Sequence, residues 1–329
     1  MKAPSLSRRE FVHSASALAA VLALPGVARA HDEHEGKPAA ATRKRALRIA
    51  HLTDMHVQPE RKGDQGFTAC LRHLRAQKDP ADLILFGGDT VFDSFDENES
   101  RTRMLWELWQ KLLKDECGTE HACCIGNHDI WGWNKSKSGT SGSEARYGKR
   151  WVLEIFGVEK PWRSFDKGGW HFIILDSTQP DGGDGYIAKL DDEQFEWLQG
   201  DLAATPATTP VLILSHIPIL SAAAYMGNGA EKSGNWVVSG SVMHRDARRL
   251  KNLCRKHANV KLACSGHLHL VDRVDYLGVS YLCNGAVSGG WWKGANQECE
   301  PGYAMIDLFA DGGFESQYVE YGWKAAADA

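Results

Sequence analysis

Five apolar runs along the chain each end at a polar residue that can bind a metal ion. The runs cover residues 47–53, 82–86, 121–125, 211–215 and 260–264. Short apolar runs bounded by glycine and polar residues are typical of buried β-strands. In open α/β sheets, ligands gather beyond the carboxyl ends of the strands. The pattern therefore predicts one site that is assembled from most of the chain.

Other periodic segments predict the rest of the fold. Additional strands are expected at residues 170–175, 279–283 and 303–308. Helices are expected at residues 66–78, 100–115, 143–156, 191–202 and 244–257. Strands that alternate with helices favour the α/β class, although the later strands are less regularly interleaved.

The polar residues at the strand ends indicate what the site binds. Asp54 and His56 are two residues apart, as are His267 and His269, and on an extended segment both members of such a pair face one side. Carboxylate and imidazole suit hard or borderline metal ions, and the absence of cysteine from the set argues against a closed structural zinc site. Glycines beside these residues are expected to form tight turns, at Gly87, Gly88, Gly126 and Gly266. Taken singly, such residues are more often turn or capping residues, so the interpretation rests on their combination.

In this order and spacing, the residues resemble the calcineurin-like metallophosphoesterases. The signature of that family is Asp-x-His, Gly-Asp, Gly-Asn-His-Asp/Glu, a lone His and Gly-His-x-His. All five blocks occur in order between Asp54 and His269, and segments 190–198 and 215–218 also look like their family counterparts. The resemblance implies an α/β fold of two facing mixed β-sheets flanked by helices, a four-layer sandwich.

The resemblance also implies two divalent or trivalent metal ions, with iron, manganese and zinc all compatible with the donor set. The ligands of the first ion would be Asp54, His56 and His269. The ligands of the second ion would be Asn127, His216 and His267. Asp89 would bridge both ions, and a hydroxide between them would attack phosphorus in line.

Two residues of the Asn-His-Asp block are expected to act without binding metal. By resemblance, His128 is the general acid or a hydrogen-bond donor to the transition state, and Asp129 would orient its imidazole. Purple acid phosphatases carry a tyrosine three residues after the bridging aspartate, whereas this chain has Phe92 there. The chain therefore resembles the phosphodiesterase-type branch.

The expected function is hydrolysis of phosphoester bonds in small molecules, with a cyclic-nucleotide-like phosphodiester as the first candidate substrate. A phosphomonoesterase or a nucleotide pyrophosphatase is the alternative. A catalytically silent metal-binding protein on the same fold is a different class, and the intact block at residues 127–129 argues against it. Tryptophans in two polar loops, at 131, 133, 291 and 292, could wall the site, although core packing is the favoured interpretation.

The N-terminus has the pattern of a twin-arginine signal peptide over residues 1–30. Arg8 and Arg9 precede an apolar stretch at 15–24, and Ala28-Arg29-Ala30 fits a cleavage site. The stretch is short for a membrane span, and no other segment is a candidate, so no stable membrane anchor is expected. A linker at 31–44 and the catalytic domain at 45–325 would follow. The expected location is periplasmic or secreted, with the twin-arginine translocation machinery as a partner.

Charge and cysteine content narrow the possible partners. Removal of residues 1–30 takes away four basic residues and one acidic residue, which changes the formal charge from −4 to −7. This balance argues against binding of nucleic acid polymers and against a strong pull toward anionic membranes. The eight cysteines contain no Cys-x-x-Cys motif and predict no disulfide framework. Metal identity, substrate and oligomeric state stay open.

Overall fold

The computed structural model describes residues 43–227, 231–232 and 234–325, which fall in one compact unit that begins at Arg43. The predicted signal peptide at 1–30 and residues 31–42 of the predicted linker lie outside the described residues. Within the described part, no helix is long and apolar enough to cross a membrane. All eight cysteines are described, and each is unpaired.

The first sheet contains five strands in the order β15-β14-β1-β2-β3. Their bounds are β1 Arg45–Leu52, β2 Leu83–Phe86, β3 His121–Cys123, β14 Gly302–Phe309 and β15 Phe314–Glu320. β1, β2 and β3 are parallel, whereas β14 and β15 are added antiparallel at one side. The carboxyl ends of β1, β2 and β3 therefore meet at one edge of the sheet.

The second sheet contains six strands in the order β12-β13-β11-β8-β5-β4. Their bounds are β4 Arg163–Lys167, β5 Trp170–Leu175, β8 Val211–Ser215, β11 Val260–Ser265, β12 Val271–Tyr276 and β13 Val279–Asn284. The four central strands are parallel, and the two edge strands β4 and β12 are antiparallel to their neighbours.

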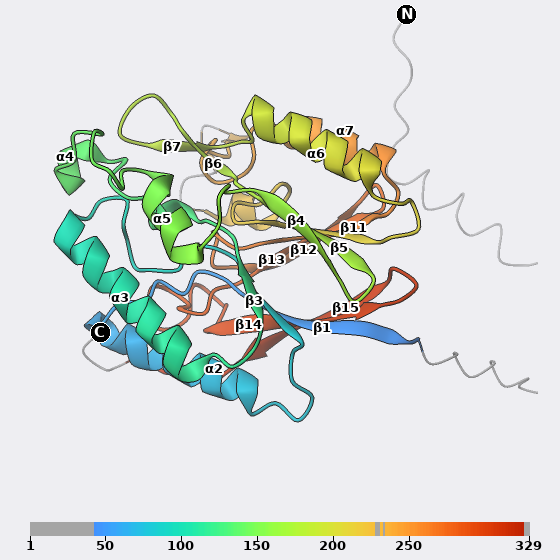
Figure 1. The fold of residues 1–329 in the computed structure, drawn as a ribbon, viewed down its shortest axis with the longest axis horizontal. Coiled ribbons are helices and arrows are strands. Elements are labelled where there is room, and N and C mark those ends of the chain that lie inside the picture. Colours follow the sequence, from blue (N-terminus) through green and yellow to red (C-terminus); the bar gives the residue numbers. More distant parts are fainter. Residues whose placement is uncertain (1–42, 228–230, 233, 326–329) are drawn as a thin grey trace, which may run out of the picture. The chain divides into compact units, whose positions relative to one another are not determined.

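The helices cover the outer faces of the two sheets (Figure 1). The longer ones are α2 Gly63–Arg75, α3 Glu99–Glu116, α5 Lys149–Phe156, α6 Asp192–Ala204 and α7 Ala247–Lys256. The remaining elements are short: η1 Glu60–Lys62, η2 Asn127–Asp129, α4 Lys135–Ser138, η3 Ala223–Met226, and the hairpins β6 Thr178–Pro180 with β7 Tyr186–Ala188 and β9 Glu231–Lys232 with β10 Asn235–Trp236.

Alternation of apolar residues along the central strands builds three layers of core. Ile49 of β1 and Leu212 of β8 point between the sheets and belong to the same buried cluster. Leu52 of β1 packs with residues of α2 and α3, whereas Ile213 of β8 packs with residues of α6 and α7. This period of two is what a strand buried on both faces requires. The predicted four-layer α/β sandwich is confirmed.

The sequence did not predict the edge strands, and the helices expected to start at 66, 143 and 244 begin at Gly63, Lys149 and Ala247. β4, β12 and β15 read RSFDK, VDRVDY and FESQYVE, and their side chains are mostly exposed or half-buried, so they lack a continuous apolar run. The helix expected at 143–156 begins only at Lys149, because Gly148 has a positive φ of 72° that a helix cannot accommodate.

Candidate metal centre

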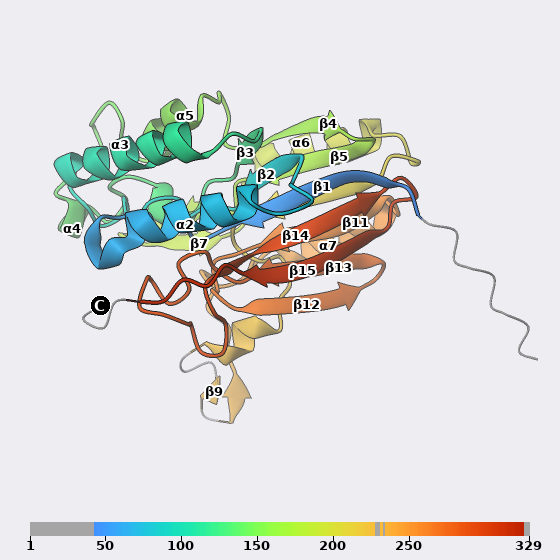
Figure 2. The same cartoon turned by 90° about the horizontal axis from the view of Figure 1, so that it is seen from below.

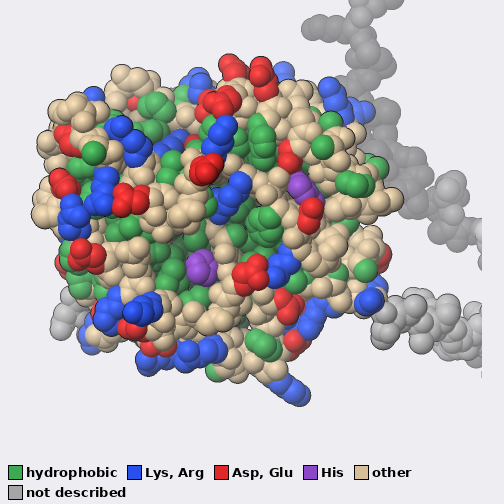
Figure 3. Space-filling view, in the orientation of Figure 1, with side chains coloured by type: hydrophobic (Ala, Val, Ile, Leu, Met, Phe, Trp, Pro, Cys, Tyr) green, Lys and Arg blue, Asp and Glu red, His purple; other side chains and the backbone are tan. Residues whose placement is uncertain are grey.

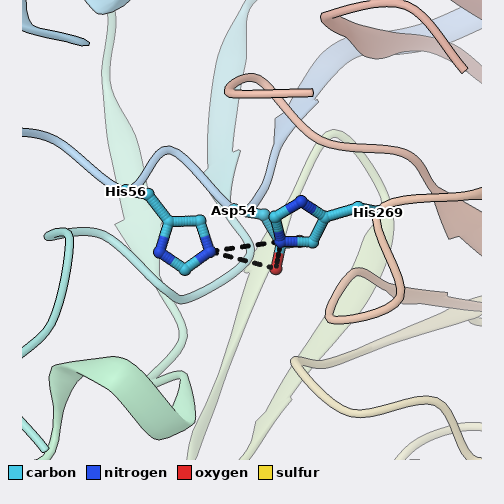
Figure 4. Close-up of side chains that lie close together, drawn as sticks. All are labelled: Asp54, His56 and His269. Atoms are coloured by element: carbon cyan, nitrogen blue, oxygen red, sulfur yellow. Dashed lines mark hydrogen bonds and ion pairs between the residues drawn. The ribbon is translucent and has the colours of Figure 1, made fainter. Parts of the chain in front are cut away.

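Ligand groups from both sheets meet beyond the carboxyl ends of the parallel strands. One group is Asp54, His56 and His269, and a second is Asp89, His216 and His267. Within each group, the candidate ligand atoms all lie within 4.8 Å of one another. Figure 4 shows the first group, with the two imidazoles turned toward the Asp54 carboxylate. Six of the seven residues predicted as metal ligands are therefore brought together in two groups of three.

Asp89 joins the two groups, and Asn127 completes the predicted set. Asp89 Oδ2 lies 3.2 Å from His216 Nε2 and 3.7 Å from His56 Nε2, so one carboxylate oxygen reaches a ligand of each group. The Asn127 amide oxygen lies 3.2 Å from His216 Nε2. Asp89 thus lies between the two groups, and Asn127 lies beside the second group.

Backbone carbonyls fix the orientation of the imidazoles. The Nδ1 atoms of His56, His216 and His269 lie 3.2, 2.8 and 2.5 Å from the carbonyl oxygens of Phe92, Gly87 and Gly289. Since a carbonyl can only accept, Nδ1 carries a hydrogen, and Nε2 is the ring atom that faces the centre. His267 is reversed, because its Nε2 donates to the Ser241 carbonyl at 3.0 Å. Its Nδ1 therefore carries the lone pair that could bind a metal ion.

The backbone at the ligand pairs is left-handed, which corrects the expected extended geometry. φ is 53° at Asp54, 42° at His56, 70° at His267, 55° at His269 and 50° at Asp89. A non-glycine residue in this region costs about 1–2 kcal/mol, so the surrounding structure must hold each one in place. Two of these residues are fastened by backbone bonds, Asp54 N to Gly88 O at 3.0 Å and His56 N to Asp89 O at 2.9 Å.

Glycines beside the ligands serve close approach more than turn geometry. A Cβ on Gly126 would lie 2.1 Å from the backbone nitrogen of Asp89, and a Cβ on Gly266 would lie 2.1 Å from Asp54 Oδ2. Neither glycine has a positive φ, whereas Gly88 does, at 94°. The turn expectation therefore holds at Gly88. Positions 126 and 266 require glycine because Asp89 and Asp54 are packed against them.

His128 lies beside the ligands, and its partner differs from the predicted one. Its backbone nitrogen donates to Asp89 Oδ1 at 2.8 Å, and its Nδ1 lies 3.2 Å from Asp93 Oδ1. Asp129 instead accepts from the backbone nitrogens of Thr90 and Gly126, both at 2.8 Å. The expectation that Asp129 orients the His128 ring is wrong, because the η2 turn directs this buried carboxylate toward backbone donors. Asp93 was missed because it stands in no motif.

The buried charges of the centre hold one another in unusual protonation states. Burial lowers the pKa of His56 to about 3, against the charge of Asp89. Burial likewise lowers the pKa of His267 to about 4, and the charge of His216 adds to the effect. At His216, burial is outweighed by the charge and hydrogen bond of Asp89, which raise the pKa to about 9. The pKa of Asp89 is held well below its usual value, against burial, chiefly by His216.

His128 and Asp129 are shifted in ways that suit a proton donor and a structural carboxyl. At His128, burial is outweighed by the charge of Asp89 and by the hydrogen bond with Asp93, which raise the pKa to about 9. Burial and the charge of Asp89 raise the pKa of Asp129 to about 7. His128 therefore carries a proton near neutral pH, as an acid must before it donates.

Aromatic rings border both ligand groups. The Trp291 ring stacks on His56 at a centroid distance of 3.7 Å and lies edge-on to His128 at 4.9 Å. The Tyr186 ring lies 6.3 Å from the His267 ring. Trp131 and Trp292 are buried in the core, as the packing interpretation predicted, whereas Trp291 departs from it. No spacing signal distinguishes Trp291 from its neighbour Trp292.

Comparison with known proteins shows which family the sequence matches. The chain matches the family model described as calcineurin-like phosphoesterase over residues 47–271. It is 27% identical over 281 residues to a 3',5'-cyclic-nucleotide phosphodiesterase of Nostoc sp., covering 82% of this chain and 90% of the relative. It is 26% identical to a probable cyclic nucleotide phosphodiesterase of Synechococcus sp., covering 68% of this chain and 73% of that one.

A solved structure agrees on the fold. A dimetal phosphatase from Danio rerio superposes with a TM-score of 0.56 at 13% identity, covering 85% of this chain and all of that one. The fold, the site and the family match thus define a metallophosphoesterase of the α/β class, a hydrolase that acts on phosphoester bonds. The chain belongs to the calcineurin-like phosphoesterase family.

Proposed function

We propose that this protein is a binuclear metal-dependent phosphodiesterase that acts on small, cyclic-nucleotide-like substrates. The observation that carries the proposal is the pair of ligand groups connected through Asp89, with His128 beside them. The relatives from Nostoc sp. and Synechococcus sp. both bear cyclic-nucleotide phosphodiesterase names, which supports this substrate class.

The residues fit two metal ions. Each group offers a carboxylate and two imidazoles within one coordination sphere, and carbonyl bonds aim the free ring nitrogens inward. When bound, two ions would polarise the phosphoryl oxygens and acidify water between them. We assign the first ion to Asp54, His56 and His269, and the second to Asn127, His216 and His267, with Asp89 shared. Iron, manganese and zinc all suit these donors.

His128 is the residue that would protonate the leaving oxygen. Its ring is 24% exposed, so a substrate can reach it, and Asp93 holds Nδ1 so that Nε2 is free to face the substrate. Positioned acid–base groups contribute typically about 10²–10⁴-fold to a rate. Asp129 would keep the η2 turn in place through the backbone nitrogens of Thr90 and Gly126.

A substrate screen on metal-reconstituted protein tests the proposal. The panel is 3',5'-cyclic AMP, bis(p-nitrophenyl) phosphate, p-nitrophenyl phosphate and a nucleoside pyrophosphate, each with iron, manganese and zinc. The expected result is a higher kcat/KM for the two diesters than for the monoester. A preference for the monoester or the pyrophosphate would select the alternative function. Absence of turnover with every ion would favour a silent metal-binding protein.

Export is a separate part of the proposal. Arg8, Arg9 and the cleavage pattern at 28–30 support delivery to the periplasm or beyond through the twin-arginine machinery. Replacing both arginines by lysine should leave the precursor in the cytoplasm, which fractionation and immunoblotting can follow. Normal export of this variant would show that the signal has been misread.

A further inference from the structure

The described residues expose seven large apolar side chains, and all seven fall in the segments 225–237 and 271–277. They are Tyr225, Met226, Trp236, Val237, Val271, Tyr276 and Leu277, each between 40% and 58% exposed. We refer to these seven residues as the apolar patch. Scattered exposed apolar residues are normal, but a cluster confined to two segments marks an interaction site.

The two segments lie next to each other in the fold. Tyr225 and Tyr276 line one surface concavity, and Met226 and Val271 line another. The Tyr225 ring contacts the Trp236 ring edge-on at 5.8 Å. Figure 2 shows the β9 hairpin projecting away from the two sheets, near β12. Shared concavities and ring contacts thus connect five residues of the apolar patch: Tyr225, Met226, Trp236, Val271 and Tyr276.

A row of cations borders the apolar patch. Arg248, Lys251 and Arg255 follow at spacings of three and four on α7, so they share one helix face. Arg248 and Lys251 line the same concavity as Tyr225 and Tyr276. None of these three cations forms an ion pair with a carboxylate in the described part of the chain, whereas the neighbouring Arg249 pairs with Asp192 at 2.9 Å. We refer to Arg248, Lys251 and Arg255 as the basic face.

The face drawn in Figure 3 has a different distribution of charges. On the face drawn in Figure 3, acidic and basic side chains are interspersed over most of the area. The net charge of −4 predicts no attraction to anionic surfaces, but screening limits each charge to a range of about 8 Å at physiological salt. A local group of unpaired cations therefore acts independently of the distant acidic residues.

We propose that the apolar patch and the basic face together dock this protein reversibly on an anionic lipid surface. Tryptophan and tyrosine favour the level of the lipid headgroups, and short apolar side chains at a protruding tip can enter the acyl boundary. Cations next to them meet the anionic headgroups and add electrostatic attraction to the apolar contact. Pairing of the free edge of β12 with a second copy is opposed by its charged residues Asp272, Arg273 and Asp275.

The docking surface is connected to the metal centre. Trp236 and Val237 lie a few residues before Ser241, whose carbonyl accepts from the His267 imidazole at 3.0 Å. Docking would thus hold the loop beside the second ligand group against the lipid surface. This inference goes beyond the proposed hydrolysis and does not depend on it.

Vesicle flotation with the full chain tests the docking. The probes are vesicles of phosphatidylglycerol mixed with phosphatidylcholine, and vesicles of phosphatidylcholine alone. One variant combines Trp236→Ser with Val237→Ser, and a second combines Arg248→Glu with Lys251→Glu. The matched control combines Lys78→Glu with Lys114→Glu, two exposed cations near α2 and α3 on the opposite side of the sandwich. Residues 1–42 are the same in all proteins, so any contribution from them cancels.

The expected result is binding of the wild type and the control to the anionic vesicles, and weaker binding to the neutral ones. Both variants should partition to the anionic vesicles at least about tenfold less than the wild type. The serine variant loses two apolar side chains of the patch, and the glutamate variant loses two cations of the basic face. Hydrolysis of soluble bis(p-nitrophenyl) phosphate and the thermal midpoint should stay unchanged, which shows that the variants are folded. Equal partitioning of the wild type and both variants would overturn the proposal. A wild-type dimer that both variants abolish would instead assign the surface to self-association.

Discussion

At the scale of single residues, the pairing of His128 with Asp93 decides how the proposed acid works. Asp93 is missing from the motif, yet it is the carboxylate that contacts the His128 ring. A histidine next to two carboxylates is favoured in its charged form, and this explains why its pKa is raised to about 9. The role therefore depends on a neighbour that only the folded chain supplies.

Asp93→Asn should lower the pKa of His128, because it removes the charge and the anionic acceptor that raise it. The alkaline limb of kcat should consequently move to lower pH, while metal content is unchanged.

His128→Ala should lose about 10²–10⁴-fold in kcat, with a smaller loss for p-nitrophenolate, which leaves without a proton. Measuring kcat against pH and leaving group, with metal assays on the same samples, checks both variants.

Asp96→Asn is the matched control, since Asp96 binds Lys137 and Asn134 outside the centre. An unchanged alkaline limb in Asp93→Asn would mean that this carboxylate does not tune His128. A loss in His128→Ala that follows metal content would make His128 a structural residue of the site.

Trp291 is the aromatic residue expected to support the first ligand group. Its ring stacks on His56 and lies nearly parallel to His269 at 5.5 Å, so it limits rotation of both imidazoles. Trp291→Leu should weaken retention of one of the two ions by about 10–100-fold, as loss of a group that supports a ligand commonly does. Elemental analysis after dialysis against graded chelator measures this effect. Trp236→Leu, on the exposed hairpin, is the control, and equal retention in all three proteins would limit Trp291 to substrate contact.

At the scale of elements, His171 connects two strands of the second sheet to the helix α6. It lies on β5, and its two ring nitrogens contact Asp166 of β4 at 2.6 Å and Asp201 of α6 at 2.9 Å. Burial lowers the pKa of His171, but the two carboxylates outweigh it and raise the pKa. The imidazolium therefore stabilises the packing of α6 on the sheet.

The sign of the pH dependence follows from the raised pKa of His171. Its contribution to the free energy of unfolding is fully present below the unfolded pKa of about 6.5 and is lost as pH rises through the higher folded pKa. His171→Gln should cost about 2 kcal/mol at pH 5.5 and markedly less at pH 9. Urea unfolding of both proteins at the two pH values gives the comparison. His121→Gln, an exposed histidine bonded only to the Thr119 carbonyl, should show no such difference. A cost for His171→Gln that is equal at both pH values would contradict the ion-pair explanation.

At the scale of the whole molecule, the centre joins the two sheets. Asp54, Asp89 and Asn127 follow strands of the first sheet, and His216, His267 and His269 follow strands of the second. Ions bound here would link the sheets, and binding to the folded state alone adds about 4 kcal/mol at a thousandfold excess over Kd. Chelation should therefore abolish hydrolysis and lower the thermal midpoint together.

Readdition of metal should restore both properties at two ions per chain. Elemental analysis and thermal melts on the same samples provide the measurement. Asp89→Asn should bind fewer ions and gain less stability on reconstitution, because Asp89 contacts both groups. Full activity with a single ion would exclude the shared role of Asp89.

The sequence by itself determined the α/β fold class, the central strands and the candidate metal-binding residues that follow them. Buried parallel strands are continuous apolar runs, and their polar ends carry residues whose type and spacing are local properties. For this reason the chain alone indicated β1, β2, β3, β8 and β11 and the candidate metal-binding residues at their ends. The half-exposed edge strands could not, because their alternation is weak and their position depends on the neighbour they pair with.

Only the tertiary structure decided which carboxylate faces His128, which tryptophan borders the ligands and how the backbone turns at them. Asp93, Trp291 and the left-handed ligand pairs depend on contacts between segments far apart in the sequence, and no local pattern encodes such contacts. The same holds for the apolar patch, and for the position of the α7 cations next to it, although their spacing on one helix face is a local property. The sum of charges along a chain is fixed by composition, whereas the folded surface decides which charges stand together unpaired.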